Sequence, residues 1–246
     1  MRVALFIPCY IDQFYPQVGI ATLQLLEKFG CEVVFPEKQT CCGQPMANSG
    51  FARESEKTSL HFIETFKGFD YIVGPSGSCV LHVKEHFSLS QPPDAYHQVK
   101  ENIFELCQFL HGVLNIKTFD VSFPHKVGLH SSCHGQRGMR LAQSSEINGP
   151  DFSIMRDLLN GVKDIELIEL TRKDECCGFG GTFAVAEEAV SVAMGNDRVE
   201  DHENNGAEVI TGGDVSCLMH MEGLISRQNK NLKVLHIAEI LNGISI

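Results

Sequence analysis

Two pairs of adjacent cysteines, each followed by a glycine, are the chemically distinctive feature of this sequence. Cys41 and Cys42 precede Gly43, and the same three residue types recur at 176–178. Cysteine thiolates bind zinc and iron–sulfur centres, and they are also redox nucleophiles. Structural zinc sites normally use spaced pairs, whereas a centre with several irons can use neighbouring thiolates. Glycine adopts positive φ, so it fits a sharp turn that directs both thiols to one centre.

Each adjacent pair belongs to a set of four cysteines, and the order of the set is the same in both halves of the chain. A cysteine follows the first expected strand, Cys-Cys-Gly follows the second, and Cys-x-x-His follows the third. The candidate metal ligands are Cys9, Cys41, Cys42 and Cys79 in the first set, and Cys133, Cys176, Cys177 and Cys217 in the second. Four cysteines is the usual ligand count of an iron–sulfur cluster. The repetition predicts a duplication, with one repeat over residues 1–120 and the other over 121–246.

Short apolar runs alternate with helical patterns around these cysteines. Strands are expected at 3–8, 31–36 and 70–79, and helices at 15–30 and 51–68, each helix being closed by a glycine. The second half runs through the same order. A loop is expected at 88–94, followed by an apolar-faced helix that carries Ile103, Phe104, Cys107 and Leu110 at helical spacing.

Strands that alternate with helices predict an α/β fold made of two pseudo-symmetric Rossmann-like repeats with mostly parallel sheets. In open parallel sheets, ligands bind at the carboxyl ends of the strands. The four cysteines of each set are therefore expected to meet at one edge. Cys31 and Cys107 fall outside the repeat and are expected in the core.

Four histidines lie close to the patterned cysteines. His82 and His220 each follow a cysteine by three residues, which places both side chains on one helical face. His130 and His134 flank Cys133. His82, His134 and His220 either ligate iron or donate a hydrogen bond to a ligand sulfur, and the pattern leaves both roles open. For His130 and His134, the "HSSCH" stretch favours a place around the ligands or on the substrate side over a place in the core.

Composition narrows the possible classes of function. The chain has 246 residues, of which 43% are hydrophobic and 21% charged, as in globular proteins. A net charge of −11 disfavours nucleic-acid binding, because it repels phosphates. No run is long enough for a membrane span, and the first residues resemble a buried strand rather than a secretory signal. A cytoplasmic location is therefore expected. Thiols stay reduced there, so ten cysteines indicate metal or redox chemistry.

The stretches "IPCYIDQFYP", "QTCCGQP", "HSSCH" and "CCGFGGTFAV" resemble the duplicated cysteine-rich CCG domain. That domain occurs in the cysteine-rich component of heterodisulfide reductase, in the iron–sulfur component of glycolate oxidase and in the lactate utilization protein A family, to which the motifs are most similar. The resemblance implies one iron–sulfur cluster per repeat, of the [4Fe-4S] type. It also implies electron transfer in the oxidation of a 2-hydroxy acid, L-lactate to pyruvate, beside a ferredoxin-like iron–sulfur protein similar to lactate utilization protein B.

One motif departs from the fullest form of the family pattern, which ends in Cys-x-x-Cys. Here the third motif reads Cys79-Val-Leu-His82 and Cys217-Leu-Met-His220. Each centre is therefore a four-cysteine cluster, a cluster with one histidine ligand, or a different metal, with zinc possible in one site. Two other functions also stay open: a zinc-stabilised interaction protein, and a thiol–disulfide reductase of the heterodisulfide type. Because no flavin or nucleotide motif is recognisable, hydride chemistry is expected at an unusual cluster or on a partner.

Overall fold

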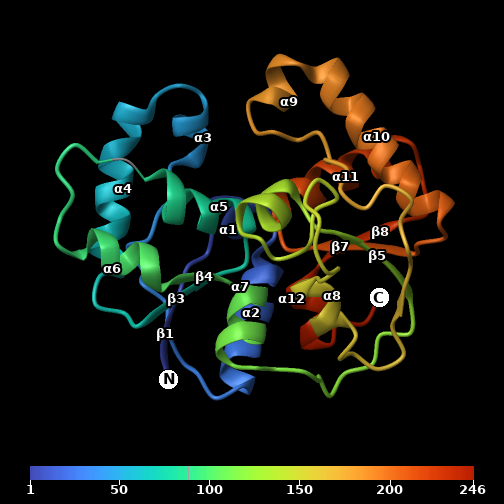
Figure 1. Cartoon of the computed structure of the whole chain (residues 1–246), viewed down its shortest axis with the longest axis horizontal. Helices are drawn as coiled ribbons and strands as arrows, with labels where there is room; N and C mark the ends of the chain where they lie inside the picture. Colours follow the sequence, from blue (N-terminus) through green and yellow to red (C-terminus); the bar gives the residue numbers. More distant parts are fainter. Residues whose placement is uncertain (88) are drawn as a thin grey trace.

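The strands form two separate four-stranded sheets, one in each half of the chain (Figure 1). The computed structural model describes residues 1–87 and 89–246. The first sheet has the order β2-β1-β3-β4, with β1 (Arg2–Leu5), β2 (Glu32–Val34), β3 (Tyr71–Gly74) and β4 (Ile103–Glu105). The second has the order β6-β5-β7-β8, with β5 (Lys126–His130), β6 (Glu166–Leu167), β7 (Val209–Gly212) and β8 (Lys233–His236). All pairings between these strands are parallel, which confirms the predicted α/β class and its pseudo-symmetry.

Helices connect the strands and cover both faces of each sheet. The first half contains α1 (Cys9–Phe14), α2 (Pro16–Lys28), α3 (Gln44–Asn48), α4 (Ala52–Phe66), α5 (Gly77–Leu81), α6 (Ala95–Asn102) and α7 (Leu106–Gln108), with π-helical turns η1 (His82–His86) and η2 (Phe109–Val113). The second contains the π-helical turn η3 (His134–Gly138), then α8 (Ile154–Leu159), α9 (Phe183–Ala186), α10 (Glu188–Asn204), α11 (Val215–Arg227) and α12 (Ile237–Asn242). None of the helices in the described ranges is long and apolar enough to cross a membrane.

Successive residues of a strand point to opposite faces of its sheet, and this alternation divides the core into layers. Val3 and Leu5 of β1 face the core between the two sheets, whereas Ala4 of β1 and Phe6, the next residue after the strand, face the outer helix α4. The outer core of the second half lies under α10 and α11 and includes Val199 and Leu218.

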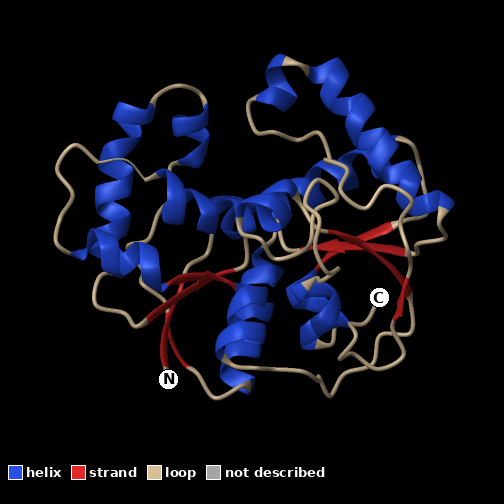
Figure 2. Cartoon of the chain, viewed as in Figure 1, coloured by secondary structure: helices blue, strands red, loops and turns tan. Residues whose placement is uncertain are grey.

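The two halves share the core that lies between their sheets. Figure 2 shows helices in the space between the two groups of strands, and among them α2 packs against α12. Leu25 of α2 and Ile240 of α12 are fully buried in this core. Burial of each such side chain contributes about 1.5–3 kcal/mol. The edge-to-face contact of Phe29 with Phe119, at 5.7 Å between ring centroids, extends the shared core.

Most of the expected elements are present, and one is wrong. The predicted helix through Ile103 and Phe104 is instead strand β4, and helix begins only at Leu106. A short apolar run satisfies strand and helix periodicity alike, and here pairing with β3 decides the outcome. The equivalent strand β8 was not anticipated. Residues 89–94 form the expected loop, while Ser88 lies outside the described residues.

Candidate metal centre

All eight patterned cysteines line one cavity of about 490 Å³, to which both halves contribute. The cavity lies at the carboxyl ends of the strands, where successive βα loops meet. Its wall also includes Tyr10, Phe179 and Val185, as well as Pro45 of α3. In Figure 1, α3 and α9 stand on either side of this edge. The two sets of thiols therefore face a common space rather than two remote sites.

The first set comes from three loops that follow β1, β2 and β3. Cys9 begins α1, the Cys41–Cys42 pair precedes α3, and Cys79 lies in α5. The Sγ atoms of Cys9 and Cys41 are 3.5 Å apart. Gly43 has φ of +86°, and its N–H donates to Cys41 Sγ at 3.4 Å. The adjacent pair thus bends as its glycine predicts, with Cys42 buried and Cys41 only half-buried.

The second set repeats this arrangement. Gly178 has φ of +83°, and its N–H donates to Cys176 Sγ at 3.4 Å. The Sγ atoms of Cys177 and Cys217 lie within 4.8 Å of each other and of a ring nitrogen of His130. The Cys-Cys-Gly turn is therefore the same local structure in both halves, and the backbone amide after the pair supports the charge of the first thiolate.

The charge of each set is concentrated on one sulfur. Thiols of Cys42 and Cys9 donate to Cys41 and lower its pKa to about 2. The same donation to Cys41 raises the pKa of Cys9 and of Cys42 above the ordinary thiol value. In the second set, donation from Cys133 and Cys177 lowers the pKa of Cys176 to about 2.

These shifts allow a test of whether the residues fit a metal. Without a cation, ionising a second thiol of a set is opposed by burial and by the first thiolate. A bound metal ion removes this opposition, because it deprotonates the thiols that coordinate it. Each set, with four sulfurs from three loops, therefore fits a polynuclear metal–thiolate centre. For a mononuclear zinc site, the adjacent pair is unusual.

The four histidines occupy different places around the cavity. His134 lines it, whereas His82 is buried behind Cys41, close enough for their charges to interact. Burial lowers the pKa of His82 to about 4, so its ring is neutral at pH 7. His220 turns toward α10, and its Nε2 donates to the Ser191 carbonyl at 3.3 Å. His130 contacts the second set more closely than the sequence indicated.

Asp214 is a residue of the cavity wall that the sequence analysis missed. Its side chain is buried and accepts hydrogen bonds from Ser78 N at 2.9 Å, Ser78 Oγ at 3.1 Å and Ser216 Oγ at 2.8 Å. Ser78 belongs to the first half, so Asp214 joins the two repeats beside both sets of thiols. The repeat itself held the signal, because Asp214 takes the place of Ser76 three residues before the last cysteine of its set.

Cys31 and Cys107 lie away from the cavity, in the core between the sheets. Cys107 is fully buried, and burial raises its pKa well above the ordinary thiol value.

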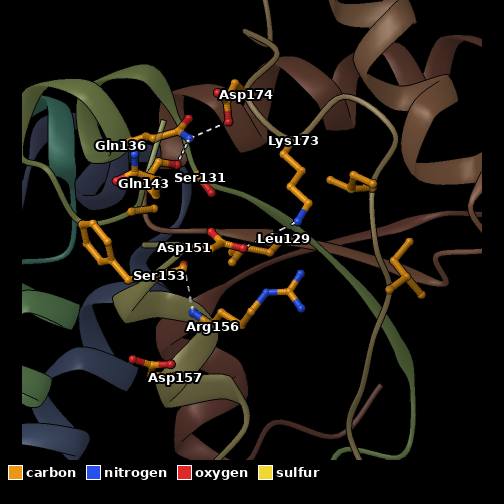
Figure 3. Close-up of a pocket in the computed structure, with 14 residues that line it drawn as sticks. Leu129, Ser131, Gln136, Gln143, Asp151, Ser153, Arg156, Asp157, Lys173 and Asp174 are labelled. Atoms are coloured by element: carbon orange, nitrogen blue, oxygen red, sulfur yellow. Dashed lines mark hydrogen bonds and ion pairs between the residues drawn. The ribbon is translucent and has the colours of Figure 1, made fainter. Parts of the chain in front are cut away.

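A second, smaller cavity of about 170 Å³ lies in the second half (Figure 3). Lys173 reaches toward Asp151 in this view and also pairs with Glu169 at 3.2 Å. Arg156 pairs with the same Glu169 at 2.5 Å. The basic side chains of this smaller cavity are thus paired with neighbouring carboxylates, and no cysteine of the described residues lines it.

Comparison with known proteins supports the duplication. The model of the cysteine-rich domain called CCG matches the chain twice, over residues 3–84 and 127–222. Lactate utilization protein A of Halalkalibacterium halodurans is 43% identical over 98% of this chain and 97% of its own length. Lactate utilization protein A of Bacillus subtilis is 41% identical over 98% of the chain and 99% of its own length. The chain belongs to the lactate utilization protein A family of CCG-domain proteins.

Each CCG match contains one complete set of four cysteines together with its Cys-x-x-His. Among solved structures, a hypothetical protein from Helicobacter pylori aligns with a TM-score of 0.60 at 14% identity. The alignment covers the whole of this chain and 49% of that one. This likeness supports the fold alone, so the chemistry of this CCG protein must be argued from its cysteines.

Proposed function

We propose that this chain is an iron–sulfur electron-transfer subunit of a complex that oxidises a 2-hydroxy acid, L-lactate to pyruvate. The observation that carries the proposal is the convergence of two four-cysteine sets on one cavity. The names of the curated relatives supply the lactate part of the proposal. An iron–sulfur centre held by each set, of the [4Fe-4S] type, would accept and release single electrons. We propose residues 1–120 and 121–246 as the two units, each holding one centre.

The proposed ligands are Cys9, Cys41, Cys42 and Cys79 for the first centre, and Cys133, Cys176, Cys177 and Cys217 for the second. His82, His134 and His220 are proposed to lie around these ligands and to hydrogen-bond near the sulfurs. Of these, His134 is placed in the cavity wall, and the Nδ1 of His82 is a buried ring nitrogen with no partner in the described chain. His220 already donates to a backbone carbonyl, which favours a supporting role over ligation.

The wall of the cavity favours electron transfer over independent substrate oxidation. Oxidation of lactate to pyruvate releases two electrons and two protons, and the lactate carboxylate needs a partner for its charge. Among the described residues that line the cavity, none is a lysine or an arginine. The wall instead offers thiols, hydroxyls, amides, the His134 ring and the Asp214 carboxylate, as well as apolar groups such as Phe179 and Val185. A helper protein is therefore proposed to share in the carbon chemistry.

The proposed helper is a ferredoxin-like iron–sulfur protein similar to lactate utilization protein B. Apolar side chains around the cavity support a docking face there, since electrons must leave near the thiols. Val185 of α9, at the cavity wall, is 85% exposed, and Met46 of α3 is 41% exposed. A net charge of −11 favours a less acidic partner, whose approach would be steered by opposite charge.

The test is to co-express the chain with that helper and to follow reduction of the bound centres by L-lactate under anaerobic conditions. The proposal expects a stable complex in which L-lactate, but not D-alanine, bleaches the visible absorption of the centres. Val185→Asp should weaken the complex, and Ile147→Asp, at an apolar side chain that is 62% exposed and lies outside the cavity wall, should not. If the isolated chain oxidised lactate at a rate that no partner increased, the assignment as a subunit would be wrong.

A second candidate function rests on the 3.5 Å separation of Cys9 and Cys41 Sγ. In metal-free protein, the Cys41 thiolate could attack a disulfide, and Cys9 could then displace the mixed disulfide and form a Cys9–Cys41 bond. This is thiol–disulfide reduction without a cluster. Under this alternative, Cys9→Ser should trap the mixed disulfide, and the removal of iron should leave the reductase activity unchanged.

A further inference from the structure

The two repeats differ in what packs beneath their cysteines. In the first half, Phe6 directly follows β1 and contacts Phe62 and Phe66 of α4, with ring centroids 4.9 and 5.7 Å away. The two α4 rings are themselves 4.5 Å apart. All three side chains are fully or almost fully buried. These three positions of the first half thus hold an aromatic cluster without charge.

The second half places His130, Arg198 and His202 in the corresponding positions. His130 ends β5, one residue before the loop that leads to Cys133, just as Phe6 stands before the loop to Cys9. The buried residues of α4 are Ser55, Ser59, Phe62, Ile63 and Phe66, and those of α10 include Ser191, Gly195, Arg198, Val199 and His202 at the same spacing. Three phenylalanines are therefore matched by two histidines and an arginine, and these three are equally buried.

Hydrogen bonds fix how Arg198 and His130 lie. Arg198 is completely buried, and its Nη1 donates to the Arg172 carbonyl at 2.6 Å and to Asp201 Oδ2 at 3.1 Å. Its Nε donates to His130 Nδ1 at 3.2 Å. Because a guanidinium only donates, Nδ1 must accept, and the proton of the His130 ring lies on Nε2. Asp201 is held in turn by the N–H groups of Thr171 and Arg172.

The remaining nitrogen of His130 is a buried donor that lacks an acceptor. Nε2 has no hydrogen-bond partner in the described part of the chain. A ring nitrogen of His130 also lies within 4.8 Å of the Sγ atoms of Cys177 and Cys217. Leaving a buried donor unsatisfied is energetically costly, so this one points to an acceptor at the second centre. Sulfur that carries negative charge is such an acceptor.

We propose that His130, held in one tautomer by Arg198, donates a hydrogen bond from Nε2 to a sulfur of the second centre and thereby raises the reduction potential of that centre, a contribution that Phe6 cannot make at the equivalent position of the first half. This inference rests on the proposed iron–sulfur function. A hydrogen-bond donor stabilises the more negative, reduced state of a cluster, whereas a phenylalanine at the same position does not. His130 and Arg198 act as positioning and tuning residues, not as ligands.

The experiment is an anaerobic redox titration of the holoprotein, followed by electron paramagnetic resonance. Cys42→Ser and Cys177→Ser assign each signal to the first or the second centre. His130→Phe installs the residue of the first repeat. It should lower the equilibrium constant for reduction of the second centre at least tenfold, which is a fall of about 59 mV in the reduction potential of a one-electron couple. The first centre should be unmoved. His130→Gln retains an N–H donor of similar reach, so the second centre of this variant should keep a reduction potential close to that of wild type. Phe62→Leu is the matched control and should leave the second centre unchanged.

Arg198→Lys gives an independent arm if His130→Phe does not fold. It keeps the positive charge but removes the Nε–H contact that sets the tautomer, so the second centre should again fall in potential. An unchanged second centre in His130→Phe, or in Arg198→Lys where His130→Phe does not fold, would overturn the inference while leaving the iron–sulfur function standing. Loss of iron from the second centre in His130→Gln would also overturn it, since it would make His130 a ligand. Wild-type protein without two redox-active iron–sulfur signals would remove the proposed function and this inference together.

Discussion

Glu105 should make the stability of the protein fall as the pH rises through neutrality. Its side chain ends β4 and is fully buried, with Oε2 accepting from Gln108 N at 3.0 Å. Burial, with a smaller contribution from the nearby negative charge of Asp214, raises its pKa from 4.5 to about 7. The folded protein therefore holds a proton on Glu105 at pH values where the unfolded chain has lost it.

The size of the effect follows from that pKa. Between pH 4.5 and about 7, the native state binds more protons at Glu105 than the unfolded state, so the free energy of unfolding decreases with pH across this window. Each pKa unit corresponds to about 1.36 kcal/mol, which gives a loss of about 3 kcal/mol by pH 8. Glu105→Gln keeps an oxygen that can accept from Gln108 N and removes the ionisation. Because part of this loss has already occurred at pH 5, the variant should gain about 2.5 kcal/mol relative to wild type between pH 5 and pH 8.

The assay is urea unfolding of the reduced, metal-free protein at pH values from 5 to 8, for wild type, Glu105→Gln and Glu27→Gln. Glu27 is an exposed residue of α2, so its variant should follow wild type at every pH. Burial lowers the pKa of His202 to about 2, so buried histidines also contribute to the pH dependence of stability. Their contribution is the same in all three proteins and cancels in the comparison. The reasoning about Glu105 would be refuted if the profiles of wild type and Glu105→Gln ran parallel across the whole range.

Three further predictions concern the site and its support. Gly178→Ala should lose metal from the second centre, because a Cβ there would lie 2.6 Å from the Ser191 carbonyl oxygen. At Gly43 the nearest contact of a Cβ is 3.4 Å, so Gly43→Ala should cost only about 1 kcal/mol of backbone strain, and metal content per chain checks the contrast. Asp214→Ala should lower the free energy of unfolding by about 2–3 kcal/mol, since it leaves the buried Ser78 N–H without its acceptor. The control Ser216→Ala should cost less than about 1 kcal/mol, and equal losses in urea unfolding would contradict the role of Asp214 in joining the two halves. Cys31→Ser and Cys107→Ser should lower stability but leave iron content at the wild-type value, and a loss of iron in either would show that the cavity does not hold all the ligands.

Much of the fold was accessible from the sequence because the strong signals are local. Pro16 and Gly30 mark the limits of α2, and Gly68 follows α4, as helix capping predicts. The two strands β4 and β8 were missed because parallel pairing with β3 and β7, respectively, creates them. Contacts between segments distant in sequence are not visible in a local pattern.

In the candidate site, too, local sequence patterns were predictive and contacts between distant segments were not. Repetition of the cysteines and the rule for parallel sheets together predicted that each set would gather at one edge. That the two edges face a single cavity depends on the packing of α2 against α12, which no motif encodes. The environment of His130 was likewise hidden, because Arg198 lies far along the chain and reads in the sequence as an ordinary helix residue.

The most direct test of the account is to measure iron, acid-labile sulfide and zinc per chain after anaerobic purification of wild type, Cys42→Ser and Cys177→Ser. The account predicts a brown protein with iron and sulfide in both centres, roughly half of that content in each single variant, and no stoichiometric zinc. Substitution of one ligand from each adjacent pair should remove one centre without the other, because each set is complete within its own repeat. A colourless protein with stoichiometric zinc and no sulfide, or equal iron content in all three proteins, would contradict it.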